Sequence, residues 1–297
     1  MKAYEAKNIK NVALLGHSSC GKTTLCEAML NVTGAIERLG SVADGTTVSD
    51  FDAEEKKRHV SVSSSVVPIV WKDTKINIID APGLFDFENG SAEAVRAAEA
   101  VLIVTSAGSG VDVGTEKAFK AAEKRGLAKF FAITKTDSDH RSFYKTFEAL
   151  KEVYGNKLCP TIIPYMEGNI TKSYVNLMTG MAYEYDENGK ATKVPMPNDP
   201  VIEEMTSAFM EAVATTDDEL MEKFFEGETF TPDEILKGLC TGIFDGSIYP
   251  VYAVAGLTGA GVDQLLYNLA WSVPGAYGYA GETAKNEAGE DVILPCD

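Results

Sequence analysis

The feature that most constrains this chain is a glycine-containing loop between a strand pattern and a helix pattern. Residues Gly16–Thr24 read GHSSCGKTT and match the pattern G-x-x-x-x-G-K-[ST]. The apolar run Asn11–Leu15 precedes the loop, and the amphipathic stretch Thr23–Leu30 follows it. Glycines let backbone N–H groups close around phosphate oxygens, and the positive end of the following helix strengthens the attraction. The sequence therefore predicts a phosphate loop (P-loop) that binds a nucleotide.

Two side chains of the P-loop have predictable chemistry. The Lys22 ammonium is expected to bridge the β- and γ-phosphates, and the Thr23 hydroxyl is expected to ligate Mg²⁺. The other loop residues would contact the phosphates mainly through their backbone. The predicted nucleotide-binding residues of the loop are His17, Ser18, Ser19, Cys20, Gly21, Lys22, Thr23 and Thr24.

A second motif that would face the phosphates follows a predicted strand. Asp80 ends the strand Lys75–Asp80 and is followed by Ala81-Pro82-Gly83. A carboxylate at this place can hold Mg²⁺ through water, and the Gly83 N–H can reach the γ-phosphate. The ordinary alternative is an aspartate that caps a turn. The P-loop upstream favours the magnesium interpretation.

The base is predicted from Thr134-Lys135-Thr136-Asp137, which follows the strand pattern Phe130–Thr134. The Asp137 carboxylate can accept hydrogen bonds from guanine N1–H and the N2 amino group, and the Lys135 stem can lie over the ring. Adenine has no donor at either position, and leaving a buried carboxylate unpaired costs roughly 1–3 kcal/mol. This motif therefore favours a guanine nucleotide over the adenine nucleotide of a P-loop kinase or ATPase. Backbone N–H groups after the last strand, at Ala255, Gly256 and Leu257, are further candidates for contacting guanine O6.

Strand and helix patterns alternate over the first half of the chain. This alternation predicts an α/β fold: a P-loop NTPase domain with a mainly parallel sheet flanked by helices. The predicted strands include Val66–Trp71, Lys75–Asp80, Val101–Thr105 and Phe130–Thr134, and the predicted helices are Ala92–Ala100, Glu116–Arg125 and Arg141–Tyr154.

The pattern changes near Lys157, where several β segments are followed by the helical stretches Val201–Phe225 and Pro232–Gly242. A βα pattern returns at Tyr249–Ala255 and Gly261–Trp271. We therefore predict a GTP-binding domain over 1–156 and 248–275, interrupted by an inserted α+β subdomain at 157–247. The segment 276–297 is expected to be a linker into a next domain outside this chain.

Composition limits the classes of partner. The net charge of −17 argues against a broad basic face for nucleic acid in these 297 residues. The apolar stretches are strand-sized, so no membrane span is predicted. The five cysteines lack paired metal-ligand spacing and indicate reduced thiols in a cytoplasmic protein.

The order of these motifs resembles the GTPase domain of translational GTPases, most closely elongation factor G. GHSSCGKTT resembles the family's P-loop. Thr46–Val62, which contains DFDAEEKKRHVSV, resembles its first switch, and Asn77–Phe87 (NIIDAPGLFDF) resembles its second. TIIPYMEG, MEKFFEGE and PVYAVAGLTGAGVDQLL follow in the order of the family's inserted subdomain and final base-contacting loop.

The resemblance implies GTP or GDP with Mg²⁺ as ligands, and hydrolysis of GTP to GDP and phosphate. It also implies a first switch that closes on Mg²⁺ when GTP is bound, and a role on the ribosome, contacting ribosomal RNA and proteins through the full-length factor. The isolated domain is expected to be a monomer. Ser61 stands where the family has a Mg²⁺-binding threonine, so the implied metal ligands are Thr23, Ser61 and Asp80, and the implied catalytic residues are Lys22, Ser61 and Gly83.

Other positions depart from the elongation factor G pattern. Leu84 stands where the family has the histidine that orients the attacking water, and such a group is worth about 10²–10⁴ in rate. Thr134, Ser19 and Ala255 replace an Asn, an Asp and a Ser, so the pattern is closer to that of the elongation factor G-like paralogues. Slow intrinsic hydrolysis is therefore expected. The alternative function is a GTP-dependent ribosome-binding regulator with little hydrolysis.

Overall fold

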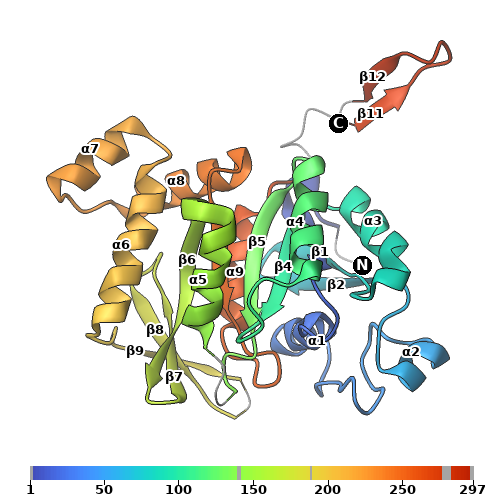
Figure 1. Ribbon diagram of the computed structural model, residues 1–297, viewed down its shortest axis with the longest axis horizontal. Coiled ribbons are helices and arrows are strands. Elements are labelled where there is room, and N and C mark those ends of the chain that lie inside the picture. The colour runs from blue at the N-terminus through green and yellow to red at the C-terminus, as the bar shows by residue number, and fades with distance from the viewer. Residues whose placement is uncertain (1–2, 139–141, 188, 276–281, 295–297) are drawn as a thin grey trace.

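The computed structural model describes residues 3–138, 142–187, 189–275 and 282–294. A ten-stranded sheet in the order β2-β3-β1-β4-β5-β10-β6-β7-β8-β9 forms its centre (Figure 1). The strands of this sheet are β1 (Ile9–Leu15), β2 (Ser65–Trp71), β3 (Thr74–Asp80), β4 (Ala100–Ser106), β5 (Ala128–Thr134), β6 (Leu158–Glu167), β7 (Ile170–Asn176), β8 (Met181–Tyr185), β9 (Ala191–Val194) and β10 (Tyr249–Ala253).

The strands from β3 to β6 in this order run parallel, and β2 and β7 to β9 are antiparallel additions at the two sides. Helices lie on both faces, with α3, α4 and α5 in front of the sheet in Figure 1 and α1 and α9 packed together behind it. The predicted fold class is therefore confirmed. The helices are α1 (Lys22–Val32), α2 (Ala53–Arg58), α3 (Glu88–Ala97), α4 (Val113–Lys124), α5 (Phe143–Tyr154), α6 (Pro200–Ala214), α7 (Asp218–Glu226), α8 (Pro232–Asp245) and α9 (Val262–Ser272).

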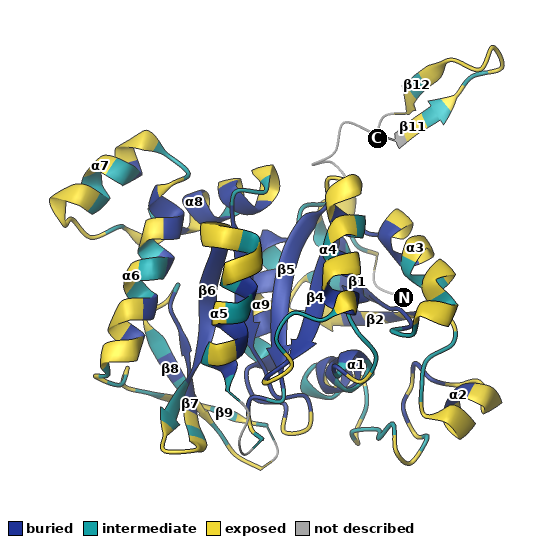
Figure 2. Ribbon diagram, viewed as in Figure 1, coloured by how far each residue is buried: buried dark blue, intermediate teal, exposed yellow. Residues whose placement is uncertain are grey.

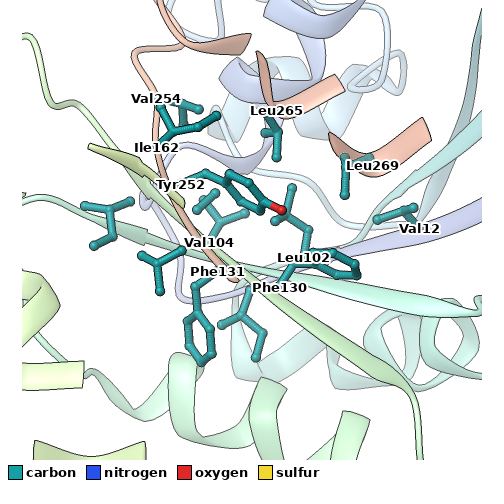
Figure 3. Packing of buried hydrophobic residues seen from close by; sticks show 14 of the residues in the cluster. Val12, Leu102, Val104, Phe130, Phe131, Ile162, Tyr252, Val254, Leu265 and Leu269 are labelled. Carbon is teal, nitrogen blue, oxygen red and sulfur yellow. The ribbon is translucent and has the colours of Figure 1, made fainter. Parts of the chain in front are cut away.

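The parallel strands at the centre of the sheet are buried, as Figure 2 shows. Sheet residues such as Leu102 and Phe130 pack with Tyr252 of β10 and with Leu265 and Leu269 of α9 (Figure 3). Burial on both faces explains why β4 and β5 appear in the sequence as continuous apolar runs rather than alternating ones. This rigid centre positions the loops at the carboxyl ends of its strands.

The segment 157–247, which is predicted to be an insertion, contributes to the same sheet. Its first strand, β6, pairs in parallel with β10, and β7, β8 and β9 continue the sheet as an antiparallel meander. The segment Asp186–Gly189, of which Asn188 lies outside the described residues, joins the antiparallel strands β8 and β9.

Three helix predictions need correction. The helix predicted over Ala92–Ala100 is α3, which begins at Glu88 and ends at Ala97, and Ala100 already belongs to β4. The single helix predicted over Val201–Phe225 is two helices, α6 and α7, because Asp217 caps a new start by accepting a hydrogen bond from the Glu219 N–H. Helix α4 begins at Val113, earlier than predicted, since Asp112 accepts from the Thr115 N–H. Local capping sets the starts of α7 and α4, and the periodicity of apolar residues does not reveal such caps.

The C-terminal part contains β11 (Glu282–Lys285) and β12 (Asp291–Leu294), which pair with each other as a separate two-stranded sheet. The rest of the predicted linker includes 276–281 and 295–297, which lie outside the described residues. Cys20, Cys26, Cys159 and Cys240 are free thiols, and Cys296 lies in the part that is not described. Over the described ranges, none of the helices combines the length and apolar character that a bilayer span requires.

Candidate functional site

The P-loop leaves β1 through a backbone conformation that requires glycine. Gly16 has φ +147°, and a Cβ at this position would lie 2.1 Å from the Val104 carbonyl oxygen in β4. At the other end, Gly21 has φ +100° and forms the N-cap of α1. The loop therefore turns tightly against the sheet and delivers the first turn of α1 to the site.

The predicted base-reading motif donates hydrogen bonds to backbone carbonyl oxygens of the P-loop. The Thr134 hydroxyl lies 2.5 Å from the Cys20 carbonyl oxygen, and the Lys135 ammonium donates to the Ser19 carbonyl oxygen at 2.7 Å. Lys135 and Ser19 both have positive φ, which places non-glycine residues in a sparsely populated conformation. The end of β5 and the P-loop are thus built as one unit.

The Lys22 ammonium points back over the loop. It donates to the carbonyl oxygens of Gly16 at 3.1 Å and His17 at 3.0 Å, and the residue is only 6% exposed. A Cβ on Gly83 would lie 2.4 Å from this nitrogen. The second switch therefore brings Gly83 directly beside the cation that is predicted to meet the terminal phosphates.

Oxygen atoms from four segments converge below the P-loop. The Thr23 hydroxyl donates to Asp80 Oδ2 at 2.8 Å and lies 3.2 Å from the Ser61 hydroxyl. Ser61 donates to Asp50 Oδ1 at 2.7 Å, and Ser49 donates to Asp80 Oδ2 at 3.0 Å. All three predicted metal ligands, Thr23, Ser61 and Asp80, are thus brought together.

This cluster has the chemistry of a hard-cation site. The second oxygen of Asp80, Oδ1, is buried and has no hydrogen-bond partner within the described structure. Burial raises the pKa of Asp80 to about 6, against the opposing effect of the nearby Lys22 charge. Hydroxyl and carboxylate oxygens suit Mg²⁺, and a bound cation would satisfy the orphaned oxygen and favour its charged form. The residues present therefore fit the ion.

Thr23, Ser61 and Asp50 of this cluster line a cavity of about 220 Å³, whereas Asp80 is buried and is not among the lining residues. The predicted site residues that line it are Ser18, Ser19, Gly21, Lys22, Thr23, Thr24, Ser61, Gly83 and Lys135. Leu84 also lines the cavity, at the place where the resemblance implies a water-orienting group, and so does His59 from the first switch. The cavity therefore joins the P-loop, both switch segments and the base-reading motif.

Sequence reasoning did not single out Asp50 or Val42, which also line the cavity. Asp50 is buried, and burial raises its pKa while the hydrogen bond from Ser61 lowers it. Asp50 lies in the stretch that resembles the first switch, but the resemblance assigns it no role, and Val42 lies before that stretch. Their roles depend on how the first switch folds back over α1, and spacing along the chain does not reveal that path.

The predicted guanine contacts lie beside the cavity. Asp137 is exposed and accepts a hydrogen bond from the Thr258 hydroxyl at 3.4 Å, so the two base-contacting loops meet. One predicted donor to guanine already has an acceptor. The Ala255 N–H donates to the Ala260 carbonyl oxygen at 2.9 Å, and this bond closes the loop. Gly256 packs against Thr24 of α1, and Leu257 is 73% exposed. The donors for guanine O6 are therefore expected from Gly256 and Leu257 rather than Ala255.

The His17 side chain packs against neighbouring elements. Its ring lies 5.8 Å from the Phe85 ring, centroid to centroid, and its buried Nδ1 has no partner among the described residues. A Cβ on Gly114 would lie 2.5 Å from its Cα, so α4 packs tightly against this part of the P-loop. The imidazole therefore packs toward the second switch, and only the His17 backbone remains a candidate for phosphate contact.

Comparison with known proteins agrees with this geometry. A sequence model described as the elongation factor Tu GTP binding domain matches residues 7–274, which span the P-loop, both switch segments and both base-contacting loops. The chain belongs to this family. This GTP-binding domain is 33% identical over 261 residues to elongation factor G-like proteins of two Mycobacterium tuberculosis strains, CDC 1551 and H37Rv. The alignment covers 87% of this chain and 36% of those relatives.

A crystal structure of a protein from Thermus thermophilus has the same fold as this GTP-binding domain. The TM-score is 0.85 at 32% identity, over 98% of this chain and 49% of the other. The GTP-binding domain thus spans about a third of the length of the curated relatives and about half of the solved one. Together these matches show that the chain contains a GTP-binding domain of the kind found in elongation factors.

Proposed function

We propose that this domain binds GTP with Mg²⁺, hydrolyses it slowly, and acts as the nucleotide switch of an elongation factor G-like protein on the ribosome. One observation supports this proposal most strongly: Lys22, Ser61 and Gly83, which come from the P-loop and the two switch segments, line a single cavity. Phosphoryl transfer depends mainly on positioning and charge stabilisation, and these groups supply both.

Each residue has a separate task. Lys22 exchanges its two carbonyl acceptors for phosphate oxygens, and the Gly83 N–H donates to the γ-phosphate. Thr23 and Ser61 would hold Mg²⁺ directly and Asp80 through water. When bound, the ion neutralises charge on the phosphates. Asp137 reads guanine from the open side of the site.

The first switch reports which nucleotide is present. Ser61 donates to Asp50, which lies in the same switch segment, and its hydroxyl oxygen lies 3.2 Å from that of Thr23 at the start of α1. A ligand that draws Ser61 inward stabilises the closed switch, and loss of the γ-phosphate removes that stabilisation. The switch would thereby alter the surface offered to a ribosome.

Leu84 favours slow hydrolysis. Its side chain lines the cavity but has no donor or acceptor with which to orient water. The same residue favours a second candidate function, a GTP-dependent ribosome-binding regulator that hydrolyses little. The two candidates differ in whether ribosomes accelerate hydrolysis.

The remaining proposals concern organisation and setting. Residues 1–156 and 248–275 would form the GTP-binding unit, 157–247 an inserted unit that shares its sheet, and 276–297 a linker. We place the protein in the cytoplasm as a monomer, with ribosomal RNA and proteins as partners of the full-length factor. The charge of −17 suggests that much of the RNA contact is made outside this domain.

Single-turnover hydrolysis of labelled GTP, with and without ribosomes, tests the proposal. We expect tight GTP binding, slow cleavage by the protein alone and acceleration by ribosomes. Unchanged slow cleavage with ribosomes would favour the regulator, and rapid cleavage by the isolated domain would contradict both candidates.

A further inference from the structure

A tyrosine of the inserted segment reaches the motif that reads the base. The Tyr174 hydroxyl, on β7, lies 2.8 Å from the Thr136 hydroxyl, and Thr136 stands between Lys135 and Asp137. Both residues are buried, with 4% of Tyr174 and 3% of Thr136 exposed. The contact therefore lies in the interior, where a hydrogen bond is not exchanged freely for water.

The direction of this hydrogen bond can be deduced. The Thr136 hydroxyl has one proton, and it donates to the Val254 carbonyl oxygen at 3.1 Å. Tyr174 must then donate to Thr136. Burial raises the pKa of Tyr174, so its proton is retained at neutral pH. A hydroxyl relay thus runs from β7 through Thr136 to the end of β10.

A second hydrogen bond from β7 holds the same residue. The Thr171 hydroxyl donates to the Thr136 carbonyl oxygen at 2.7 Å. Thr136 is therefore held at its backbone by Thr171 and at its side chain by Tyr174. Because Asp137 follows directly, these bonds restrict where its carboxylate can lie.

The inserted segment also contacts the second base-contacting loop. A Cβ on Gly189, between β8 and β9, would lie 2.6 Å from the Thr258 carbonyl oxygen, and Thr258 is the residue that donates to Asp137. The Tyr185 hydroxyl of β8 donates to Asp263 in the first turn of α9, and its ring meets the Tyr174 ring edge-on. Both loops that surround the predicted guanine position are thus supported from the same insertion.

We propose that the inserted strands set guanine selectivity, with Tyr174 and Thr171 as positioning residues for Asp137. This inference rests on the proposed guanine-binding function. Lys135, immediately before Thr136, has φ +58°, a conformation that persists only when its surroundings impose it. The hydroxyl relay at Thr136 adds to the constraint that the bonds of Thr134 and Lys135 to the P-loop already impose. The insertion therefore contributes to base recognition although none of its residues is assigned a contact with the nucleotide.

The test compares GDP with IDP, which lacks the N2 amino group. Tyr174→Phe keeps the aromatic ring and removes the donor. We expect its affinity for GDP to fall about three- to ten-fold and its affinity for IDP to fall less, so that the GDP-to-IDP preference shrinks. Thr171→Val should shift the preference in the same direction. Equilibrium titration with fluorescent nucleotides measures these ratios.

Thr206→Val is the matched control for Thr171→Val, since it also removes a part-buried threonine hydroxyl bond of 2.7 Å, here to the Ile202 carbonyl oxygen within α6. It should leave the GDP-to-IDP preference unchanged. An unchanged preference in both Tyr174→Phe and Thr171→Val would overturn the inference, and if the first variant does not fold, Thr171→Val decides. Failure of the wild-type protein to prefer GDP over ADP would instead contradict the proposed function itself.

Discussion

At the scale of single residues, Leu84 is the position where this domain departs most from the chemistry that its cavity otherwise supports. It lines the cavity beside Gly83 but has no polar side-chain atom. Leu84→His introduces a group that can orient water, and we expect single-turnover GTP hydrolysis to rise about 10²-fold. Leu84→Met is the control of similar size and should stay near the wild-type rate. Equal rates in the two variants would show that water orientation does not limit cleavage.

His59, near the end of the first switch segment, contacts the chain just before that segment begins. Its Nδ1 lies 2.9 Å from the Val42 carbonyl oxygen, its φ is +54°, and both residues line the cavity. Glycine and asparagine both tolerate this backbone conformation, but only asparagine has a side chain that can donate to the carbonyl. His59→Gly should therefore speed nucleotide release about five-fold, while His59→Asn should stay closer to wild type. Stopped-flow release of a fluorescent GDP analogue measures this, and equal rates in both variants would exclude the hydrogen bond as the cause.

The sequence motifs were sufficient to predict those binding residues that lie within short, continuous motifs. Lys22, Thr23 and Asp80 lie where their motifs place them, because each is fixed by the end of a strand or the start of a helix. The sequence gives no sign that Asp50 accepts a hydrogen bond from Ser61. It also suggests the Ala255 N–H as a donor to guanine, although that N–H donates to the Ala260 carbonyl oxygen. Both errors concern contacts made by loop folding, which the pattern of residues along the chain does not encode.

At the scale of elements, the ion pair between Lys223 of α7 and Glu234 of α8 makes stability depend on pH. Glu234 belongs to the capping box of α8 and also accepts from Lys223 of α7. The bond from Lys223 lowers the pKa of Glu234 to about 2 from its ordinary value of 4.5. A carboxylate with a lowered folded-state pKa contributes stability above its unfolded-state pKa, and that contribution is lost as pH falls from about 4.5 toward 2.

Glu234→Gln should therefore lower the melting temperature slightly at pH 7, and the difference from wild type should shrink below pH 4.5. The effect is small because both side chains are about one-third exposed. Thermal unfolding of both proteins at a series of pH values isolates this group, since the other carboxylates are common to both. A difference that stays constant across this range would contradict the lowered pKa.

Element types were predictable where apolar periodicity was strong. The strands β4 and β5 follow from apolar runs, and the helices around them follow from amphipathic stretches. The break between α6 and α7 did not follow, because it depends on the capping aspartate Asp217 inside a periodic stretch. The spacing of apolar residues indicates which face of a helix is buried, whereas the capping residues determine where the helix begins.

At the scale of the whole molecule, one sheet carries both the nucleotide-binding loops and the inserted strands. β10 returns between β5 and β6, so the last base-contacting loop lies beside the first, although the residues that join them, Asp137 and Thr258, are 121 positions apart in the chain. The sequence indicates the insertion but not this strand order, which depends on long-range pairing. The continuity of the sheet is what allows β7 to reach the base-reading motif.

The central claim is that this domain selects guanine through Asp137, and a base-swap titration tests it most directly. Asn has an amide that can donate where Asp accepts, and xanthine has a carbonyl oxygen where guanine has its N2 amino group. Wild-type protein should prefer GDP over both XDP and ADP, and Asp137→Asn should shift the GDP-to-XDP preference toward XDP by at least about 100-fold. Equal binding of ADP and GDP by the wild type, or an unchanged preference in Asp137→Asn, would contradict the account.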